Sequence, residues 1–130
     1  MTKEQYAWEW LQHAQDDLAA GRFLLAMMPL PANIVCFHCQ QAAEKALKAF
    51  LAFHGTSVPR THDLVILNES CAAHERQIET LVQQCMALND YAVDIRYPSE
   101  LHVEDNEAQK AIKEADGILS FIRGRIHDEQ

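Results

Sequence analysis

Proline and glycine are scarce in this sequence, with four of each among 130 residues. The prolines fall between amphipathic segments, where they interrupt helices. No apolar run approaches the roughly 20 residues that a membrane-spanning helix needs. The first residues lead into an amphipathic pattern instead of the apolar stretch of a secretory signal. These absences predict a cytoplasmic protein that does not enter a membrane.

Basic residues are also few, with 11 Lys and Arg against 19 Asp and Glu and a formal net charge of −8. A protein that holds nucleic acid through its overall field needs clustered Lys and Arg to neutralise phosphate. The composition excludes binding of that kind. Any contact with RNA is therefore expected to be local, short-range or assisted by a partner.

The four cysteines predict neither a metal site nor a disulfide framework. Cys36 and Cys39 form a CxxC pair inside a strongly helical stretch, and no second pair of ligands follows at zinc spacing. We expect all four to be reduced and at least half-buried, with no cofactor bound. A redox or metal role for the CxxC pair is the alternative.

The apolar pattern predicts an all-α fold. A length of 130 residues fits one domain spanning residues 1–130, and its apolar side chains recur every three or four residues, with no strand-like alternation of useful length. The expected architecture is an antiparallel up-and-down bundle of four to five helices. The helices are expected at residues 2–28, 32–54, 64–73, about 78–90 and about 105–126.

The local signals of these helices are specific. Thr2 and Gln5 form a capping box, Gly55 follows the second helix, and Thr61 or Asp63 caps the third. Trp8 and Trp10 cannot both face one core, so one of them is expected at the surface or at an interface. The apolar stripe of the first helix is assigned to Tyr6, Trp10, Ala14, Leu18, Gly21, Leu25 and Met28.

A polar stripe on the second helix is the first candidate site. His38, Gln41, Lys45 and Lys48 lie within about 80° of one another around the helix axis. An imidazole, an amide and two ammonium groups on one face could bind an anion or a phosphate. The alternative is a solvated face on which Glu44 and Lys48 form an i,i+4 ion pair.

The second candidate site is an arginine followed six residues later by a histidine, Arg96 and His102. Histidine titrates near neutral pH, so it can move the proton of a 2′-hydroxyl or of a leaving oxygen. Arginine can hold a phosphate and stabilise the charge that develops on it. Such a pair could cleave RNA without a metal, although this spacing often arises by chance.

Several segments resemble one known family. Residues 36–49, CFHCQQAAEKALKA, resemble the second-helix signature of HEPN proteins. The PRTHDL turn at 59–64, the RYP tripeptide at 96–98 and the WL…DDL opening at 10–18 match the same family in the same order. The resemblance covers residues from about 8 to 123, and its second-helix motif is specific.

The resemblance implies a helical bundle that is commonly a homodimer and is often encoded beside a minimal nucleotidyltransferase. Many HEPN proteins are metal-independent endoribonucleases of toxin–antitoxin systems. By this likeness Arg96 would bind the scissile phosphate and His102 would act as general acid or base. The sequence departs from the active pattern because Tyr97 and Pro98 follow the arginine, where a polar residue at a helix start is usual.

The leading interpretation is a HEPN module that binds a nucleotide or an RNA phosphate and associates with a nucleotidyltransferase-type partner. His38, Gln41, Lys45, Lys48 and His62 are its predicted phosphate-binding residues, although His62 could instead be a turn residue bonded to the backbone. One alternative is a metal-independent endoribonuclease toxin that uses Arg96 and His102. Another is a non-catalytic helical scaffold.

Overall fold

The computed structural model describes residues 1–92 and 103–126, and the secondary structure of these residues is entirely helical. The all-α prediction is thereby confirmed. Along the chain the elements are α1 (Lys3–Leu24), α2 (Ala32–Phe53), α3 (Leu64–Ala72), the 3₁₀ helix η1 (Arg76–Leu81), α4 (Val82–Asn89), the short 3₁₀ helix η2 (Asp90–Ala92) and α5 (Asp105–Arg125).

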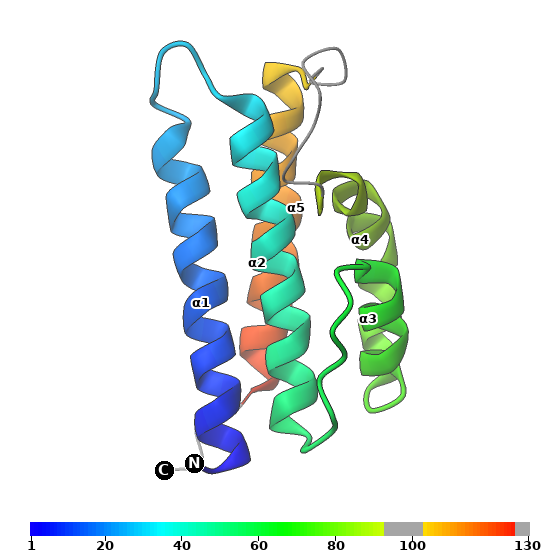
Figure 1. Cartoon of the computed structure of the whole chain (residues 1–130). Coiled ribbons are helices and arrows are strands. Elements are labelled where there is room, and N and C mark those ends of the chain that lie inside the picture. Colours follow the sequence, from blue (N-terminus) through cyan, green and yellow to red (C-terminus); the bar gives the residue numbers. More distant parts are fainter. Residues whose placement is uncertain (93–102, 127–130) are drawn as a thin grey trace.

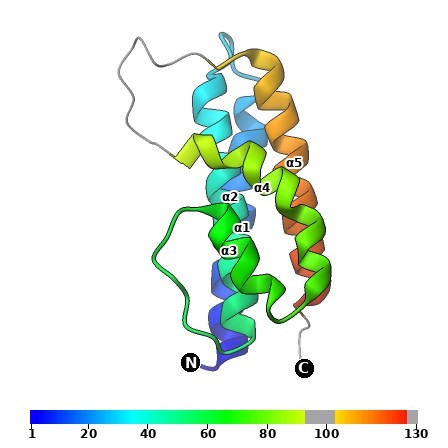
Figure 2. The ribbon, with the colours of Figure 1, turned by 90° about the vertical axis from the view of Figure 1, so that its right-hand side faces the viewer.

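Helix α2 lies at the centre of the bundle, in contact with α1, α3 and α5 (Figure 1). Helices α1 and α2 form an antiparallel hairpin. The chain returns through η1 and α4, so α5 runs in the same direction as α2 and opposite to α1 (Figure 2). None of the described helices is long and apolar enough to cross a membrane.

The predicted start and stop signals agree with the structure. Thr2 and Gln5 form the capping box at the start of α1. Gly55 follows α2 with φ of 71°, a left-handed conformation that glycine adopts without steric cost. Of the two proposed caps of α3 it is Asp63 that accepts from the backbone of Val65 and Ile66.

Two predicted helix boundaries are wrong. Helix α1 ends at Leu24 instead of near residue 28, because the backbone of Met27 already donates to Leu24, three residues back, ahead of Pro29. The fourth segment begins as a 3₁₀ helix and becomes α-helical only at Val82. There the buried amide of Asn68 donates to the Ile78 carbonyl, which competes with a regular α-helical bond at that position.

The predicted apolar stripe of α1 is wrong at its two terminal residues. Tyr6 is 42% exposed and Met28 is 88% exposed, whereas Trp10 is partly buried and packs against the core. Ala7, next to Tyr6 in the sequence, is fully buried instead. The residues of α1 that face the core are Ala7, Leu11, Ala14, Leu18 and Gly21.

The four cysteines are buried. Burial raises the pKa of Cys36 to about 11 and the pKa values of Cys39, Cys71 and Cys85 to about 12. The thiols therefore stay protonated at neutral pH and act as small apolar core groups. In the described part of the chain, His, Cys, Asp and Glu side chains form no group of three or more that could hold a metal ion.

Candidate functional site

The polar residues of α2 belong to two carboxylate-centred clusters. The first, called the Glu44 cluster, contains Glu44, Lys48 and His62. The Lys48 ammonium lies 2.9 Å from Glu44 Oε2, and the side chains of the pair are only 7% and 5% exposed. His62 Nδ1 lies 3.0 Å from Glu44 Oε1, while the imidazole ring is 71% exposed. A buried ion pair thus holds a histidine that faces outward.

Two glutamines of α2 add hydrogen bonds to the network around His62. Gln40, which is fully buried, donates through Nε2 to the backbone carbonyl of His62 over 2.9 Å. Gln41 in turn donates to Gln40 Oε1 over 2.8 Å. The α2 helix therefore fixes the loop before α3 through both the backbone and the ring of His62.

The second cluster, called the Asp17 cluster, joins α1 to α2. Asp17 Oδ2 accepts from the Lys45 ammonium at 2.6 Å, and Asp17 Oδ1 lies 3.0 Å from His38 Nδ1. The Asp17 carboxylate is 14% exposed, and its two partners are 26% and 28% exposed. Both partners are directed at the helix contact, so this cluster connects two helices.

A pocket of about 360 Å³ lies beside the Glu44 cluster. Tyr6 and Trp10 of α1 line one side, and Lys48 lies beside them on α2. Arg60 and His62 close the pocket from the loop before α3. Arg60 is exposed and makes no ion pair with a described residue. Its guanidinium is therefore available for a ligand.

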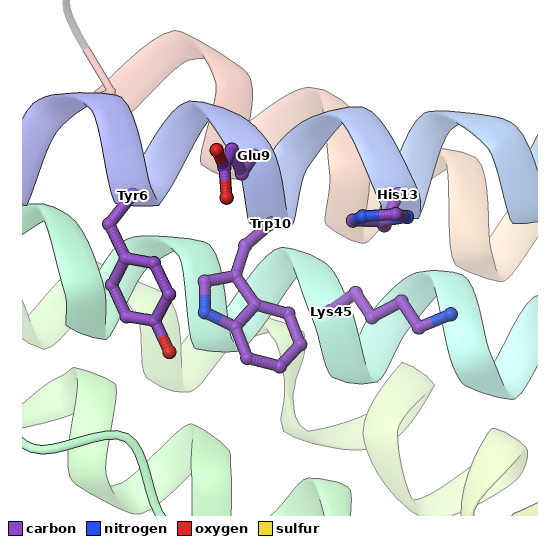
Figure 3. Close-up of a pocket in the computed structure, with 5 residues that line it drawn as sticks. All are labelled: Tyr6, Glu9, Trp10, His13 and Lys45. Atoms are coloured by element: carbon purple, nitrogen blue, oxygen red, sulfur yellow. The ribbon is translucent and has the colours of Figure 1, made fainter. Parts of the chain in front are cut away.

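A second pocket, of about 400 Å³, shares Tyr6 and Trp10 with the first. It is further lined by Glu9, His13 and Lys45. Figure 3 shows the two aromatic rings projecting from α1 over α2, with the Lys45 side chain extended alongside. The two pockets adjoin at the shared rings, and together they are called the Trp10 groove.

Trp10 is the centre of this groove. Its ring lies edge-on to Tyr6, with centroids 6.1 Å apart at 66°. The Lys48 ammonium lies 5.6 Å from the Trp10 ring centroid, close enough for a cation–π interaction. The indole Nε1 is buried and has no hydrogen-bond acceptor among the described residues. An aromatic surface and a positive charge thus meet at one position.

The structure separates the predicted phosphate-binding residues. Lys45, Lys48 and His62 line the Trp10 groove. His38 and Gln41 do not line either pocket: His38 lies 3.0 Å from Asp17, and Gln41 donates to Gln40. The predicted catalytic pair, Arg96 and His102, lies outside the described residues, so its roles stay predictions.

Sequence reasoning missed four groove residues on α1 and one in the loop before α3. The α1 residues lie at positions i, i+3, i+4 and i+7, which is one face of a helix. That spacing could have indicated the groove from the sequence alone, but it is obscured because Tyr6 and Trp10 are assigned to the apolar stripe. Arg60 enters the sequence pattern only as part of the PRTHDL turn. The missed residues are Tyr6, Glu9, Trp10, His13 and Arg60.

Comparison with known proteins agrees with this architecture. The family model described as the HEPN domain matches residues 7–125. The chain belongs to the HEPN domain family. The match covers nearly the whole sequence and confirms the resemblance carried by the second-helix motif.

One relative of this HEPN protein with a solved structure is TT1696 from Thermus thermophilus, which is 28% identical in sequence. The two structures superpose with a TM-score of 0.77, and the match covers 91% of this chain and 96% of TT1696. A second structure, of ST0689, described as an archaeal HEPN homologue, is 25% identical with a TM-score of 0.75, covering 93% and 98%. A Methanocaldococcus jannaschii protein named "Putative toxin MJ1304" is 25% identical over 142 residues, 96% of this chain and 91% of that relative.

Proposed function

We propose that this HEPN protein is a phosphate-binding module for a nucleotide or RNA, and that it works with a protein partner in a toxin–antitoxin pair. The observation that carries the proposal is the pocket in which Arg60 and His62 adjoin Lys48 and Trp10. It collects cationic side chains locally in a protein whose net charge is −8. Binding is therefore short-range, as the composition requires.

Arg60, His62 and Lys48 contribute differently. Arg60 is exposed and can make two parallel hydrogen bonds to phosphate oxygens. His62 is fixed by Glu44 at Nδ1, which leaves Nε2 to donate to a phosphate when the ring is protonated. Lys48 stays paired with Glu44 and adds positive potential behind the aromatic ring.

The toxin–antitoxin assignment rests on family membership and on the name of the Methanocaldococcus jannaschii relative. The partner is proposed to be a nucleotidyltransferase-type protein, and the chain itself is proposed to be a homodimer. Light scattering tests the dimer: a mass of twice 14.8 kDa is expected, and a mass near 14.8 kDa across micromolar concentrations would contradict it. Co-purification with the product of a neighbouring nucleotidyltransferase gene tests the partner.

The binding proposal predicts a specific effect of Arg60→Ala. Titration of fluorescein-labelled single-stranded RNA, followed by anisotropy, should show several-fold weaker binding because a phosphate contact is lost. The slope of log K against log salt should also fall by about one. Arg76→Ala is the matched control, since Arg76 is exposed on η1 and lies outside the groove. Equal binding by both variants would contradict the proposal.

Family membership, together with the word toxin in the relative's name, favours a second candidate, a metal-independent endoribonuclease that uses Arg96 and His102. Purified protein should then cleave single-stranded RNA in EDTA, and His102→Ala should abolish the cleavage. RNA left intact at micromolar enzyme would exclude this activity and leave the binding module. If RNA and nucleotides also failed to bind, the helical scaffold would be the remaining interpretation.

A further inference from the structure

The two halves of the Trp10 groove differ in charge. The half beside the loop holds Lys48, Arg60 and His62. The other half holds one acidic side chain, Glu9, which is exposed and makes no hydrogen bond or ion pair with a described residue. Lys45 lines this second half, but Asp17 holds its ammonium at 2.6 Å. Lys48 in the first half is likewise paired with Glu44, at 2.9 Å, so the charge that distinguishes the first half is the Arg60 guanidinium, which makes no ion pair with a described residue. A phosphate therefore suits the first half, because the Glu9 carboxylate would repel it in the second.

The acidic half is suited to a different chemical group. Tyr6, Glu9 and Trp10 lie at positions i, i+3 and i+4 of α1, on one face of the helix. Because the two rings stand at 66° to each other, a flat group stacked on Trp10 would lie edge-on to Tyr6, on the face that carries the Glu9 carboxylate. A carboxylate accepts hydrogen bonds from the exocyclic amino group of a base such as adenine or cytosine. Base stacking on an aromatic ring is favourable for every base.

We propose that the Trp10 groove binds one nucleotide unit across Trp10, with an amino-bearing base stacked on Trp10 and edge-on to Tyr6, on the side of Glu9, and its phosphate at Arg60 and His62. This inference rests on the proposed function, and it names the ligand and its orientation. The nucleotide unit could come from single-stranded RNA or from a free nucleotide.

Tryptophan fluorescence reports on the base directly. A Trp8→Phe variant leaves Trp10 as the sole tryptophan, since the chain has two. Titration of this variant with the tetranucleotide rA4 should quench Trp10 saturably, because a stacked base lies against the indole. The reciprocal variant, Trp10→Phe, keeps Trp8 and should show no saturable quenching. Circular dichroism of both variants checks that the helical content is unchanged.

Calorimetry then separates the base from the phosphate. Tyr6→Ala should weaken rA4 binding by about two- to twelvefold, the range expected for the loss of one edge-on aromatic contact. Phe23→Ala is the matched control, because Phe23 is an 82% exposed aromatic residue of α1 that lies outside the groove. Glu9→Gln should reduce the preference for rA4 over rU4, since uracil lacks the exocyclic amino group.

The outcomes distinguish this inference from the proposed function. If Arg60→Ala weakens rA4 binding while Trp10 is not quenched and Tyr6→Ala binds normally, the base platform is wrong and the phosphate site stands. If the wild type binds neither rA4 nor AMP, both are wrong. If AMP binds as tightly as rA4, the inference is supported and the natural ligand is a free nucleotide. If rA4 binds at least tenfold more tightly than AMP, the inference is supported and the natural ligand is RNA.

Discussion

The Glu44 and Asp17 clusters have the same composition and different surroundings. Each joins one carboxylate to one lysine and one histidine. In the Glu44 cluster the ion pair is almost completely buried and the histidine faces the Trp10 groove. In the Asp17 cluster all three side chains are partly exposed, and His38 lies outside both pockets of the groove.

The difference teaches that residue type alone does not identify the binding group. His38 and His62 both have a carboxylate at 3.0 Å, yet only His62 is on a loop that closes a pocket. Position in the fold decides which histidine can meet a ligand. The Asp17 cluster accordingly stabilises the α1–α2 hairpin, and the Glu44 cluster both stabilises the loop and prepares the site.

Glu44→Ala should give the largest loss of stability. It leaves the Lys48 ammonium buried without its partner, which is expected to lower the free energy of unfolding by about 3–5 kcal/mol. Urea denaturation at pH 7 measures the loss. The double variant Glu44→Leu/Lys48→Met removes both charges and should recover most of that stability. A single variant as stable as the wild type would contradict the buried ion pair.

Asp17→Ala should have a smaller effect. Asp17 accepts from the Lys45 ammonium and lies 3.0 Å from His38 Nδ1, and water can still reach both partners, so we expect a loss of about 1.5–3 kcal/mol in the same denaturation experiment. Asp16→Ala is the neighbouring control. Asp16 is exposed, and the stability of this variant should stay within about 0.5 kcal/mol of the wild type. If Asp17→Ala destabilised more than Glu44→Ala, the contrast between the clusters would be reversed.

His54 is a third histidine to compare with His38 and His62, because no carboxylate of a described residue lies at hydrogen-bond distance from its ring. Burial lowers the pKa of His54, and the stacked His74 ring, 4.6 Å away, and Lys3 lower it further, while Glu75 acts in the opposite direction. As the pH falls through about 6.5, the unfolded chain takes up a proton that the native state resists. Stability should therefore decrease until the native pKa is passed.

The loss of stability that His54 causes at low pH should be smaller than the losses caused by Glu44→Ala and by Asp17→Ala. Denaturation curves between pH 7.5 and pH 5 should show less acid destabilisation in His54→Gln than in the wild type. His13→Gln is the control, because His13 is exposed and makes no ring contact or ion pair with a described residue. An identical pH dependence for wild type and His54→Gln would contradict the lowered pKa.

Much of the fold could be predicted from the sequence, because helix periodicity and capping residues are local signals. The error in α1 has a geometric cause. At 3.6 residues per turn, Tyr6 lies about 120° around the axis from Leu18, whereas Ala7 lies within about 20° of it. Residues repeated every four positions therefore rotate gradually away from the side of the helix that faces the core. Tyr6 and Trp10, which belong to this repeat, line the groove.

The candidate site was less predictable because its parts meet through tertiary contacts. The i,i+4 spacing indicated the Glu44–Lys48 pair, which the structure contains. Its burial could not be read from α2 alone, since it depends on His62 and the loop before α3. The attachment of Lys45 to Asp17 spans 28 positions of the chain and carries no local signal.

The most direct test of the nucleotide-binding groove is an NMR titration of ¹⁵N-labelled protein with rA4, read at the indole N–H signals of Trp8 and Trp10. We predict a saturable shift of the Trp10 indole signal and of the Arg60 backbone amide signal, while the Trp8 indole signal stays in place. Saturable shifts confined to other parts of the bundle, with Trp10 and Arg60 unchanged, would contradict this prediction.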